Sequence, residues 1–183
     1  MKKRVFIFST SREPTRRIRS FIREMVRGIP FSSYISRGHK SLLELAIDAK
    51  NSQAERLVIC SAYKGNPGKL TFYSLSDKFE KYPIEFQILG VTLYREKHPN
   101  TKMKQDLTKL DLSFGKNIPF PLHTFLEDFL DPVLIAKGEE RTKKTGNVCL
   151  TMIGETKIEM KIKLQETEKL NSPIIRFTTL YRT

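Results

Sequence analysis

The chain has 183 residues, of which 39% are hydrophobic and 29% charged, a composition typical of a folded protein and not of a disordered one. This length predicts one domain, or at most two, with a substantial core. The net charge is +13, and residues 1–40 supply +9 of it through eleven basic and two acidic side chains. Because crowded like charges repel and do not stabilise a fold, this excess indicates a polyanionic partner, first of all RNA or DNA.

The first sixty residues alternate predicted strands and helices. Apolar, β-rich segments at 5–8, 31–36 and 56–62 predict three strands. An amphipathic segment predicts a helix at 14–28, and the capping box that begins at Ser41 predicts a second helix. This β-α-β-α-β order predicts an α/β fold in which helices cover a mixed sheet.

The helix predicted at 14–28 carries a stripe of arginines opposite its apolar face. At 100° per residue these side chains fall within roughly 80° of one another: Arg16, Arg19, Arg23 and Arg27. We expect Pro14 in the first turn, with Ser11 or Glu13 as the cap. Gly28 is a natural stop, and Arg12 would project near the stripe if the helix began early.

Arginine suits phosphate because its planar guanidinium grips it in bidentate fashion and also stacks on bases. Only one acidic residue, Glu24, lies among the four arginines. We therefore predict that this helix face binds nucleic-acid phosphates. A solvated surface helix is the alternative.

Two further basic clusters could extend that surface. Arg37 and Lys40 lie directly before a predicted helix N-terminus, where free N–H groups and the helix dipole favour an anion. Lys64 and Lys69 bracket a turn predicted at 65–68. The alternatives are that Gly38 only permits a turn and that the lysines are ordinary exposed side chains.

The rest of the chain predicts a second mixture of strands and helix. His98 to Thr101 break the pattern and mark a boundary between two halves. A loop is predicted around Pro119 and Pro121, then a helix at 122–130 with Thr124 and Glu127 as a capping box, and a polar loop at 138–147. The predicted strands are 70–75, 84–93, 107–114, 148–153, 157–164 and 174–181.

The sequence predicts no catalytic residue, no metal site and no cofactor. His39, His98 and His123 are scattered, without Cys or acidic partners at metal-ligand spacing. The segments 38–41 and 65–69 only approximate a phosphate-binding loop and lack the spacing that cradles a nucleotide. Catalysis of ATP or GTP hydrolysis is therefore disfavoured.

The cysteines and the search for targeting signals indicate the state of the thiols and the cellular compartment of the chain. Cys60 and Cys149 stand alone in apolar stretches, which favours buried free thiols over a disulfide and disfavours zinc. No segment has the length of a transmembrane helix, and the N-terminus lacks the apolar region and cleavage site of a secretory signal. We expect a cytoplasmic chain that does not contact a membrane.

Three motifs resemble those of the Brix domain family. The run Thr10-Ser11-Arg12-Glu13-Pro14, followed by Arg16, Phe21 and Glu24, resembles the opening motif of that domain. Arg37-Gly38, followed by Leu42 and Glu44-Leu45, is similar to its second motif. The strand Leu57-Val58-Ile59 leading to Lys64-Gly65-Asn66-Pro67-Gly68 resembles its third, and the segments 147–150, 158–164 and 173–181 are similar to its closing strands.

This resemblance implies a fold and a function. The fold would be one Brix domain over 1–183, built from similar α/β halves at about 1–97 and 102–183 that are related to anticodon-binding domains of some aminoacyl-tRNA synthetases. Brix proteins assist ribosome assembly and bind pre-ribosomal RNA and assembly partners. The implied partners are ribosomal or precursor ribosomal RNA, and ribosomal proteins or guide-RNA ribonucleoproteins. The chain is similar to the minimal archaeal form and is expected to be a monomer.

Our main hypothesis is a non-enzymatic RNA-binding ribosome biogenesis factor that assists RNA processing and subunit assembly. An RNA-acting enzyme, such as a nuclease or modification enzyme, and a protein-docking scaffold remain as alternatives. Phe31, Tyr34 and Tyr63 are candidates for base stacking, with burial in the core as the other reading. The predicted RNA-binding residues are Arg12, Arg16, Arg19, Arg23, Arg27, Arg37, Lys40, Lys64 and Lys69.

Overall fold

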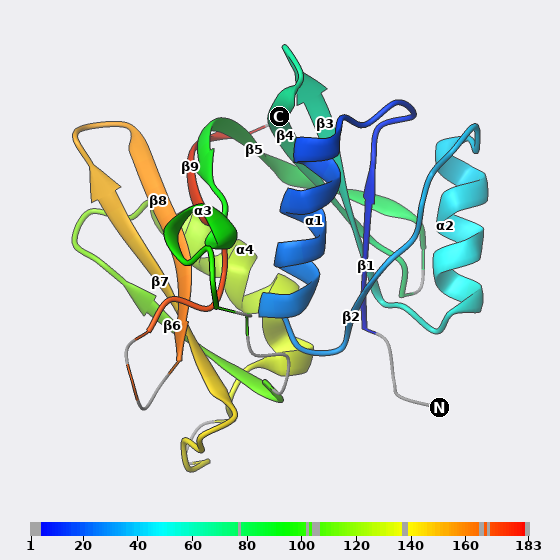
Figure 1. Ribbon diagram of the computed structural model, residues 1–183. Coiled ribbons are helices and arrows are strands. Elements are labelled where there is room, and N and C mark those ends of the chain that lie inside the picture. Colours follow the sequence, from blue (N-terminus) through cyan, green and yellow to red (C-terminus); the bar gives the residue numbers. More distant parts are fainter. Residues whose placement is uncertain are drawn as a thin grey trace.

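The computed structural model describes residues 5–76, 78–101, 103, 107–136, 139–164, 167 and 169–181. The basic residues Lys2, Lys3 and Arg4, and Gly138 of the predicted polar loop, lie outside this range. Within the described residues, nine strands form one sheet in the order β2-β1-β3-β4-β5-β9-β8-β7-β6 (Figure 1). This mixed sheet with its helices confirms the predicted α/β class.

The elements have the following bounds. The strands are β1 (Phe6–Thr10), β2 (Ser32–Tyr34), β3 (Arg56–Tyr63), β4 (Asn66–Ser74), β5 (Glu80–Thr92), β6 (Lys109–Phe114), β7 (Thr145–Ile153), β8 (Lys157–Leu164) and β9 (Ile174–Tyr181). The helices are α1 (Arg16–Gly28), α2 (Leu42–Asn51), α3 (Tyr94–Lys97) and α4 (Phe120–Leu130), followed by a short 3₁₀ turn (Asp131–Val133).

The same strand pattern occurs twice along the chain. β1 pairs with β3 in parallel, and β3, β4 and β5 form an antiparallel meander. Likewise β6 pairs with β7 in parallel, and β7, β8 and β9 form a second meander. The last strands of the two meanders, β5 and β9, pair antiparallel at the centre of the sheet. The assignment of 1–97 and 102–183 as two halves of one domain stays a prediction.

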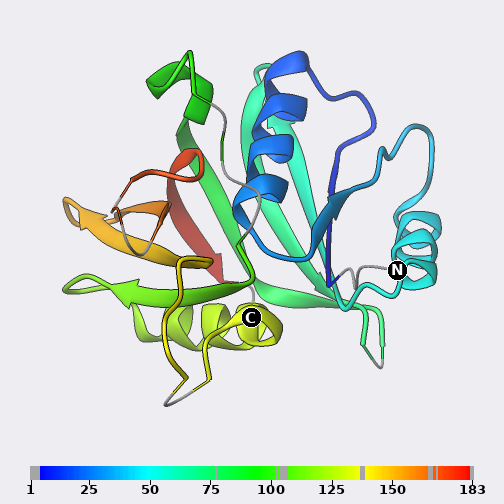
Figure 2. The same cartoon turned by 60° about the horizontal axis from the view of Figure 1, so that its bottom comes forward.

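Helices α1 and α4 share one core. Phe72 of β4 packs edge-on against Phe125 and Phe129 of α4, with ring centroids 4.9 and 5.1 Å apart. Phe21 of α1 is buried in the same cluster. Helix α2 covers the other face of β1, where Leu45 packs in a separate cluster. Figures 1 and 2 both show β1 between α1 and α2.

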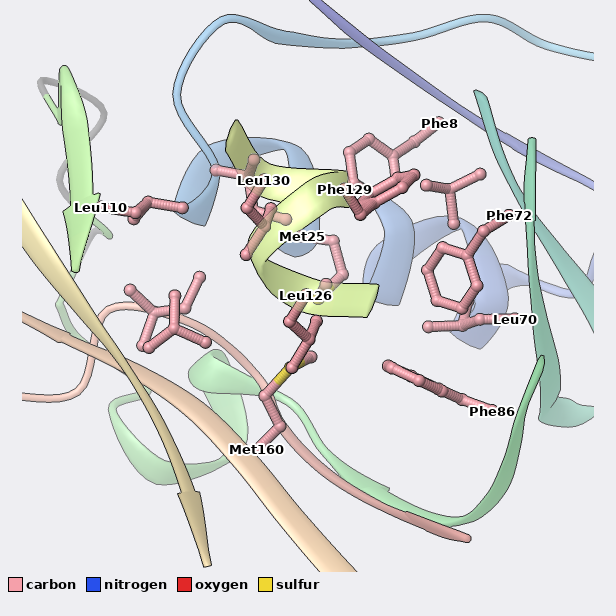
Figure 3. A pocket seen from close by; sticks show the side chains of 14 residues that line it. Phe8, Met25, Leu70, Phe72, Phe86, Leu110, Leu126, Phe129, Leu130 and Met160 are labelled. Carbon is pink, nitrogen blue, oxygen red and sulfur yellow. The ribbon is translucent and has the colours of Figure 1, made fainter. Parts of the chain in front are cut away.

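A small apolar cavity of about 40 Å³ lies inside the shared core (Figure 3). Met25 of α1, Leu126 of α4, Phe72 of β4 and Met160 of β8 are among the side chains that line it. Because these walls offer water no polar partner, an apolar cavity of this kind stays dry. We therefore treat it as imperfect packing between the two meanders.

Helix α1 starts later than predicted. Its cap is Thr15, whose hydroxyl accepts a hydrogen bond from the N–H of Ile18 at 3.4 Å. The prediction of Ser11 or Glu13 as cap was wrong, because the first turn begins only at Arg16 and the hydroxyl of Thr15 is the side-chain oxygen that reaches its N–H groups. Pro14 therefore precedes the helix instead of lying in its first turn. Arg12 consequently lies in the loop between β1 and α1.

The turn predicted at 65–68 is a tighter hairpin. Only Lys64 and Gly65 form it, with φ of 45° and 78°, and β4 already begins at Asn66. Two consecutive positive φ values are what a two-residue hairpin turn requires to match the strand twist. Gly68 lies where the β3–β4 register shifts, between Pro67 opposite Ala62 and Lys69 opposite Ser61, and a Cβ there would come within 2.4 Å of the Tyr63 Cβ.

Helix α4 also differs from its prediction. It begins at Phe120, so Pro121 lies in the first turn instead of in a loop. Proline is tolerated there because first-turn N–H groups have no partner within the helix. Thr124 is one turn inside and its hydroxyl donates to the carbonyl of Phe120 at 3.4 Å, so the predicted capping box with Glu127 was wrong.

The remaining strands agree with the sequence except at a few ends. The strands predicted at 157–164 and 174–181 are confirmed as β8 and β9. β2 is shorter than predicted because Phe31 has a φ of 53°, outside the strand region. β7 begins at Thr145 because that residue pairs with Lys109 of β6. Helix α3, at the predicted boundary, was missed.

Replacing Phe21 tests the shared core. Phe21→Ala removes a fully buried ring, and we expect a loss of about 3–5 kcal/mol in the free energy of unfolding. Arg23→Ala, on the exposed side of the same helix, should change it by less than about 0.5 kcal/mol. Urea denaturation followed by circular dichroism measures both. Equal effects would contradict this packing of α1.

Candidate nucleic-acid interface

The predicted arginine stripe is exposed along the whole of α1. Ile18, Phe21 and Met25 are buried against the sheet, and the opposite side of the helix lies in solvent. We define the arginine face as the four exposed residues of that side: Arg16, Arg19, Arg23 and Arg27. The amphipathic helix is thus confirmed, whereas RNA binding by this face stays a prediction.

Among the described residues, no carboxylate pairs with the arginine face. The guanidinium of Arg19 donates to the carbonyl of Pro14 at 2.9 Å, and this neutral acceptor does not compensate the positive charge of Arg19. The acid of the helix, Glu24, is 6% exposed and turns away from these arginines. Its carboxylate accepts the N–H groups of Tyr94 at 2.7 Å and Arg95 at 3.5 Å. Burial raises the pKa of Glu24, and these two donors oppose that rise.

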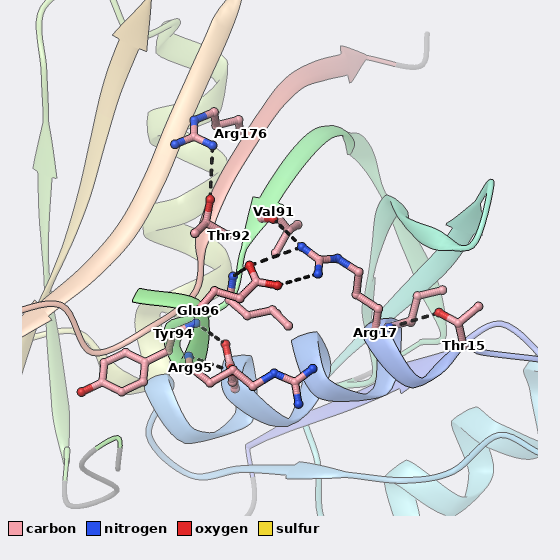
Figure 4. Close-up of polar contacts among 11 residues, drawn as sticks. Thr15, Arg17, Val91, Thr92, Tyr94, Arg95, Glu96 and Arg176 are labelled. Atoms are coloured by element: carbon pink, nitrogen blue, oxygen red, sulfur yellow. Dashed lines mark hydrogen bonds and ion pairs between the residues drawn. The ribbon is translucent and has the colours of Figure 1, made fainter. Parts of the chain in front are cut away.

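Arg17 lies on another side of the helix and has a structural role. Its guanidinium pairs with Glu96 of α3 and donates to the carbonyl of Val91 at 3.0 Å (Figure 4). The hydrogen bond from Arg17 holds the pKa of Glu96 below its ordinary value. Together with Glu24, this pair attaches one flank of α1 to the end of β5 and leaves the arginine face open.

Three loops bring further cations to one end of the sheet. β1, β2 and β3 are parallel, so the segments that follow their carboxyl ends lie at the same edge. These segments carry Arg12, the pair Arg37 and Lys40, and Lys64, respectively. The hydroxyl of Thr15 donates to the carbonyl of Gly65 at 2.7 Å, which joins the start of the arginine face to the β3–β4 turn.

Some of the predicted cations are already engaged within the protein. Lys40 forms an ion pair with Asp48, and the carbonyl of Lys40 accepts from Arg37 Nε at 3.1 Å. The N-terminus of α2 is closed by the predicted capping box, in which Glu44 accepts the N–H of Ser41. The anion site expected there therefore already holds a carboxylate. Arg12 is exposed and has no carboxylate partner among the described residues.

Lys69 also differs from a free surface lysine. Its Nζ lies 3.1 Å from Glu85, which is 2% exposed and also contacts Lys81 at 2.8 Å and Thr71 at 3.0 Å. Burial alone would raise the pKa of Glu85, but hydrogen bonds from Lys81, Lys69 and Thr71 outweigh it and lower the pKa to about 2. Lys69 of β4 is thus partly buried and forms an ion pair with the buried carboxylate of Glu85 on β5.

The three aromatic candidates for base stacking differ in how far they are exposed to solvent. Tyr63, at the end of β3, is 66% exposed, and Phe31, after α1, is 42% exposed. Tyr34 is partly buried and packs against the shared core. Only Tyr63 therefore presents most of its ring to solvent near the three loops.

Histidine, cysteine and acidic side chains are dispersed over the described part of the chain. No three His, Cys, Asp or Glu residues gather there at metal-binding distance. Cys60 and Cys149 are free thiols, as predicted. Cys60 is buried, which raises the pKa of its thiol to about 12, whereas Cys149 is only partly buried and not fully buried as predicted. No helix in the described residues has the length and apolar character needed to cross a membrane.

The chain has sequence relatives in archaea. It is 30% identical over 173 residues to a "Probable Brix domain-containing ribosomal biogenesis protein" of Sulfurisphaera tokodaii, covering 93% of this chain and 90% of that protein. A protein of the same name from Pyrococcus horikoshii is 40% identical over 92 residues, or 50% of this chain. The aligned part is only 41% of that relative's length. No family model matches the chain.

Two solved structures share the fold. A probable ribosomal biogenesis protein from Aeropyrum pernix K1 superposes with a TM-score of 0.79 at 22% identity, over 96% of each chain. Mil, an archaeal Imp4-like protein, superposes with a TM-score of 0.61 at 16% identity, over 96% of this chain and 99% of the other.

Acid titration tests the structural role of Lys69 and Glu85. Because the pKa of Glu85 falls from 4.5 to about 2 on folding, its contribution is complete above pH 4.5 and is lost as the pH drops toward 2. The stability difference between wild type and Glu85→Gln should shrink by roughly 3 kcal/mol over that window. Urea denaturation at several pH values measures it.

Glu80→Gln is the matched control, because Glu80 lies exposed on the same strand. Its stability difference should stay close to zero at every pH. A difference for Glu85→Gln that does not depend on pH would contradict the buried ion pair.

Proposed function

The chain belongs to the Brix domain family, and we propose that it is a ribosome biogenesis factor that binds ribosomal RNA or its precursors without catalysing a reaction. The curated relatives carry the name ribosomal biogenesis protein, which supports the process. We extend the proposal to assistance in RNA processing and subunit assembly, by a monomer that works within ribonucleoprotein particles. Since the relatives come from archaea, whose cells lack a nucleus, we assign this role to the cytoplasm.

The arginine face is the observation that carries the RNA-binding part of the proposal. Four guanidinium groups lie on one exposed side of α1, and the acid of that helix is turned inward. Exposed arginines without carboxylate partners are suited to bidentate contacts with phosphate. Phosphate contacts position a protein on nucleic acid, and the loops that carry Arg12 and Lys64 would extend them.

Charge reversal on the arginine face tests this proposal. Replacing Arg16, Arg19 and Arg23 together with Glu removes three cations and adds three repulsive charges. We expect affinity for ribosomal RNA fragments to fall about a hundredfold or more. Fluorescence anisotropy measures the affinity, and thermal denaturation should show a nearly unchanged midpoint because all three side chains are exposed.

The matched control makes the same change in net charge elsewhere. Lys50, Lys116 and Lys157 are exposed on α2, on a loop and on β8, and their combined replacement by Glu should weaken binding far less. Equal losses in the two triple variants would mean that only net charge matters. Unchanged affinity of the arginine variant would overturn the proposal for this face.

Salt dependence gives a second test. If the protein contacts four to six phosphates of a largely single-stranded RNA, the logarithm of the association constant should fall with that of the salt concentration at a slope of about −3 to −4. Titrations between low and moderate salt measure the slope. A slope near zero would exclude an electrostatic interface, and RNA cleavage by the purified protein would favour an enzyme instead.

A further inference from the structure

A groove opens between the β3–β4 hairpin and the end of β5. Its volume is about 350 Å³, which lies within the range of about 300–1,000 Å³ typical of small-ligand sites. Tyr63, Lys64 and Asn66 line the hairpin side, and Leu89 and Val91 are among the lining residues of β5. The hairpin projects beyond its neighbours in the sheet (Figure 1), and the hydrogen bond from Thr15 to Gly65 ties it to the start of α1.

Tyr63 gives this groove an exposed aromatic surface. Its ring is 66% exposed at a position where the backbone is well defined by strand pairing with Asn66. Lys64 Nζ lies 5.6 Å from the centre of the ring. A tyrosine held in this way offers a flat face to a partner at a low cost in conformational entropy. Such a face is suited to stacking with a nucleobase.

The β5 side of the groove supplies an apolar contact and free space. Leu89 is 50% exposed although it is a large aliphatic side chain. The pairing of β5 with β9 shifts register between Ile88 and Gly90, and nothing lies within 4 Å of the position that a Cβ of Gly90 would occupy. Asn66 is exposed; its Nδ2 donates to the carbonyl of Lys64 at 3.3 Å, and its Oδ1 can accept a hydrogen bond from a base edge.

The charged residues that line the groove favour an anionic ligand. Lys64 and Arg17 are among its lining residues, and no acidic side chain is. Because Arg17 is neutralised by Glu96, Lys64 is the cation available to a ligand. The groove is thus able to hold a flat, partly apolar group together with a negative one.

We propose that this groove binds one nucleotide of single-stranded RNA, with the base against Tyr63 and Leu89 and the phosphate at Lys64. The inference rests on the proposed RNA binding and adds a base-contacting site to it. A base within a duplex cannot reach the ring, because its faces are covered by its neighbours. The site therefore selects single-stranded segments, whereas the arginine face contacts backbone phosphates of any strand.

A tryptophan probe tests stacking directly. The chain contains no tryptophan, so Tyr63→Trp introduces a single one in the groove. We expect a single-stranded ribosomal RNA fragment to quench its fluorescence, with the same midpoint as binding followed by anisotropy. A duplex of the same sequence should not quench it. Phe120→Trp, at a 78% exposed position on α4, is the control and should not respond to either RNA.

Affinity measurements separate this site from the arginine face. Tyr63→Ala should weaken binding of single-stranded RNA about tenfold and leave duplex binding unchanged, whereas Tyr63→Phe should keep the wild-type affinity because its ring can still stack. Tyr63 is mostly exposed, so both variants should fold as the wild type does.

Each outcome has a distinct meaning. Wild-type affinity of Tyr63→Ala, or no quenching of Tyr63→Trp by bound RNA, would overturn the groove proposal. The proposal for the arginine face would still stand if the triple arginine variant loses RNA binding. Absence of RNA binding by the wild-type protein would overturn both. Quenching by a ribosomal-protein peptide but not by RNA would assign the groove to protein and also overturn the inference.

Discussion

The orientation of one carboxylate determines how α1 presents its charge. Glu24 is buried and accepts the first N–H groups of α3, which would otherwise lack partners at a helix end. Beside it, Arg17 pairs with Glu96. These contacts fix one flank of the helix against the end of β5. They bury the acid that would neutralise the arginine face, and they pair Arg17, which lies outside that face, with a carboxylate of its own.

The position of α1 also depends on the core that joins the two meanders. Phe72 packs against α4 at ring distances of 4.9 and 5.1 Å, and Phe86 of β5 stacks on Phe177 of β9 at 4.1 Å. Because β5 and β9 are the central pair of the sheet, these rings connect the earlier strands to the later ones. The arginine face is therefore carried by a helix that packs on the core shared by both meanders, and the proposed RNA would meet it at a fixed place on the sheet.

Sequence reasoning found what depends on local pattern and missed what depends on distant partners. The helical spacing of Ile18, Phe21 and Met25 was enough to predict which side of α1 carries the arginine face. The alternation of apolar and polar residues was enough to predict β8 and β9. The inward turn of Glu24 could not be predicted, because its partners lie about seventy residues later in the chain. The ion pair of Lys69, which was predicted as an RNA-binding residue, could not be predicted for the same reason, since Glu85 lies on another strand. The cap of α1 at Thr15 was missed because local rules did not decide it: the residue before a proline and an N-cap residue both have extended backbone, so Pro14 did not exclude Glu13.

The arginine and lysine side chains discussed above thus fall into two groups, those paired with carboxylates of the fold and those without such a partner that can contact a ligand. Arg17, Lys40 and Lys69 each have a carboxylate partner. Among the described residues, Arg16, Arg19, Arg23 and Arg27 have none, and they are spread over about 16 Å of helix axis, enough for a few nucleotides. The hydrogen bond from Thr15 to Gly65 sets the proposed base groove at the Arg16 end of this row. An RNA strand that follows the arginines toward that end would reach Tyr63 only with an unpaired base. The fold could therefore combine nonspecific phosphate attraction with a requirement for single-stranded character at one point.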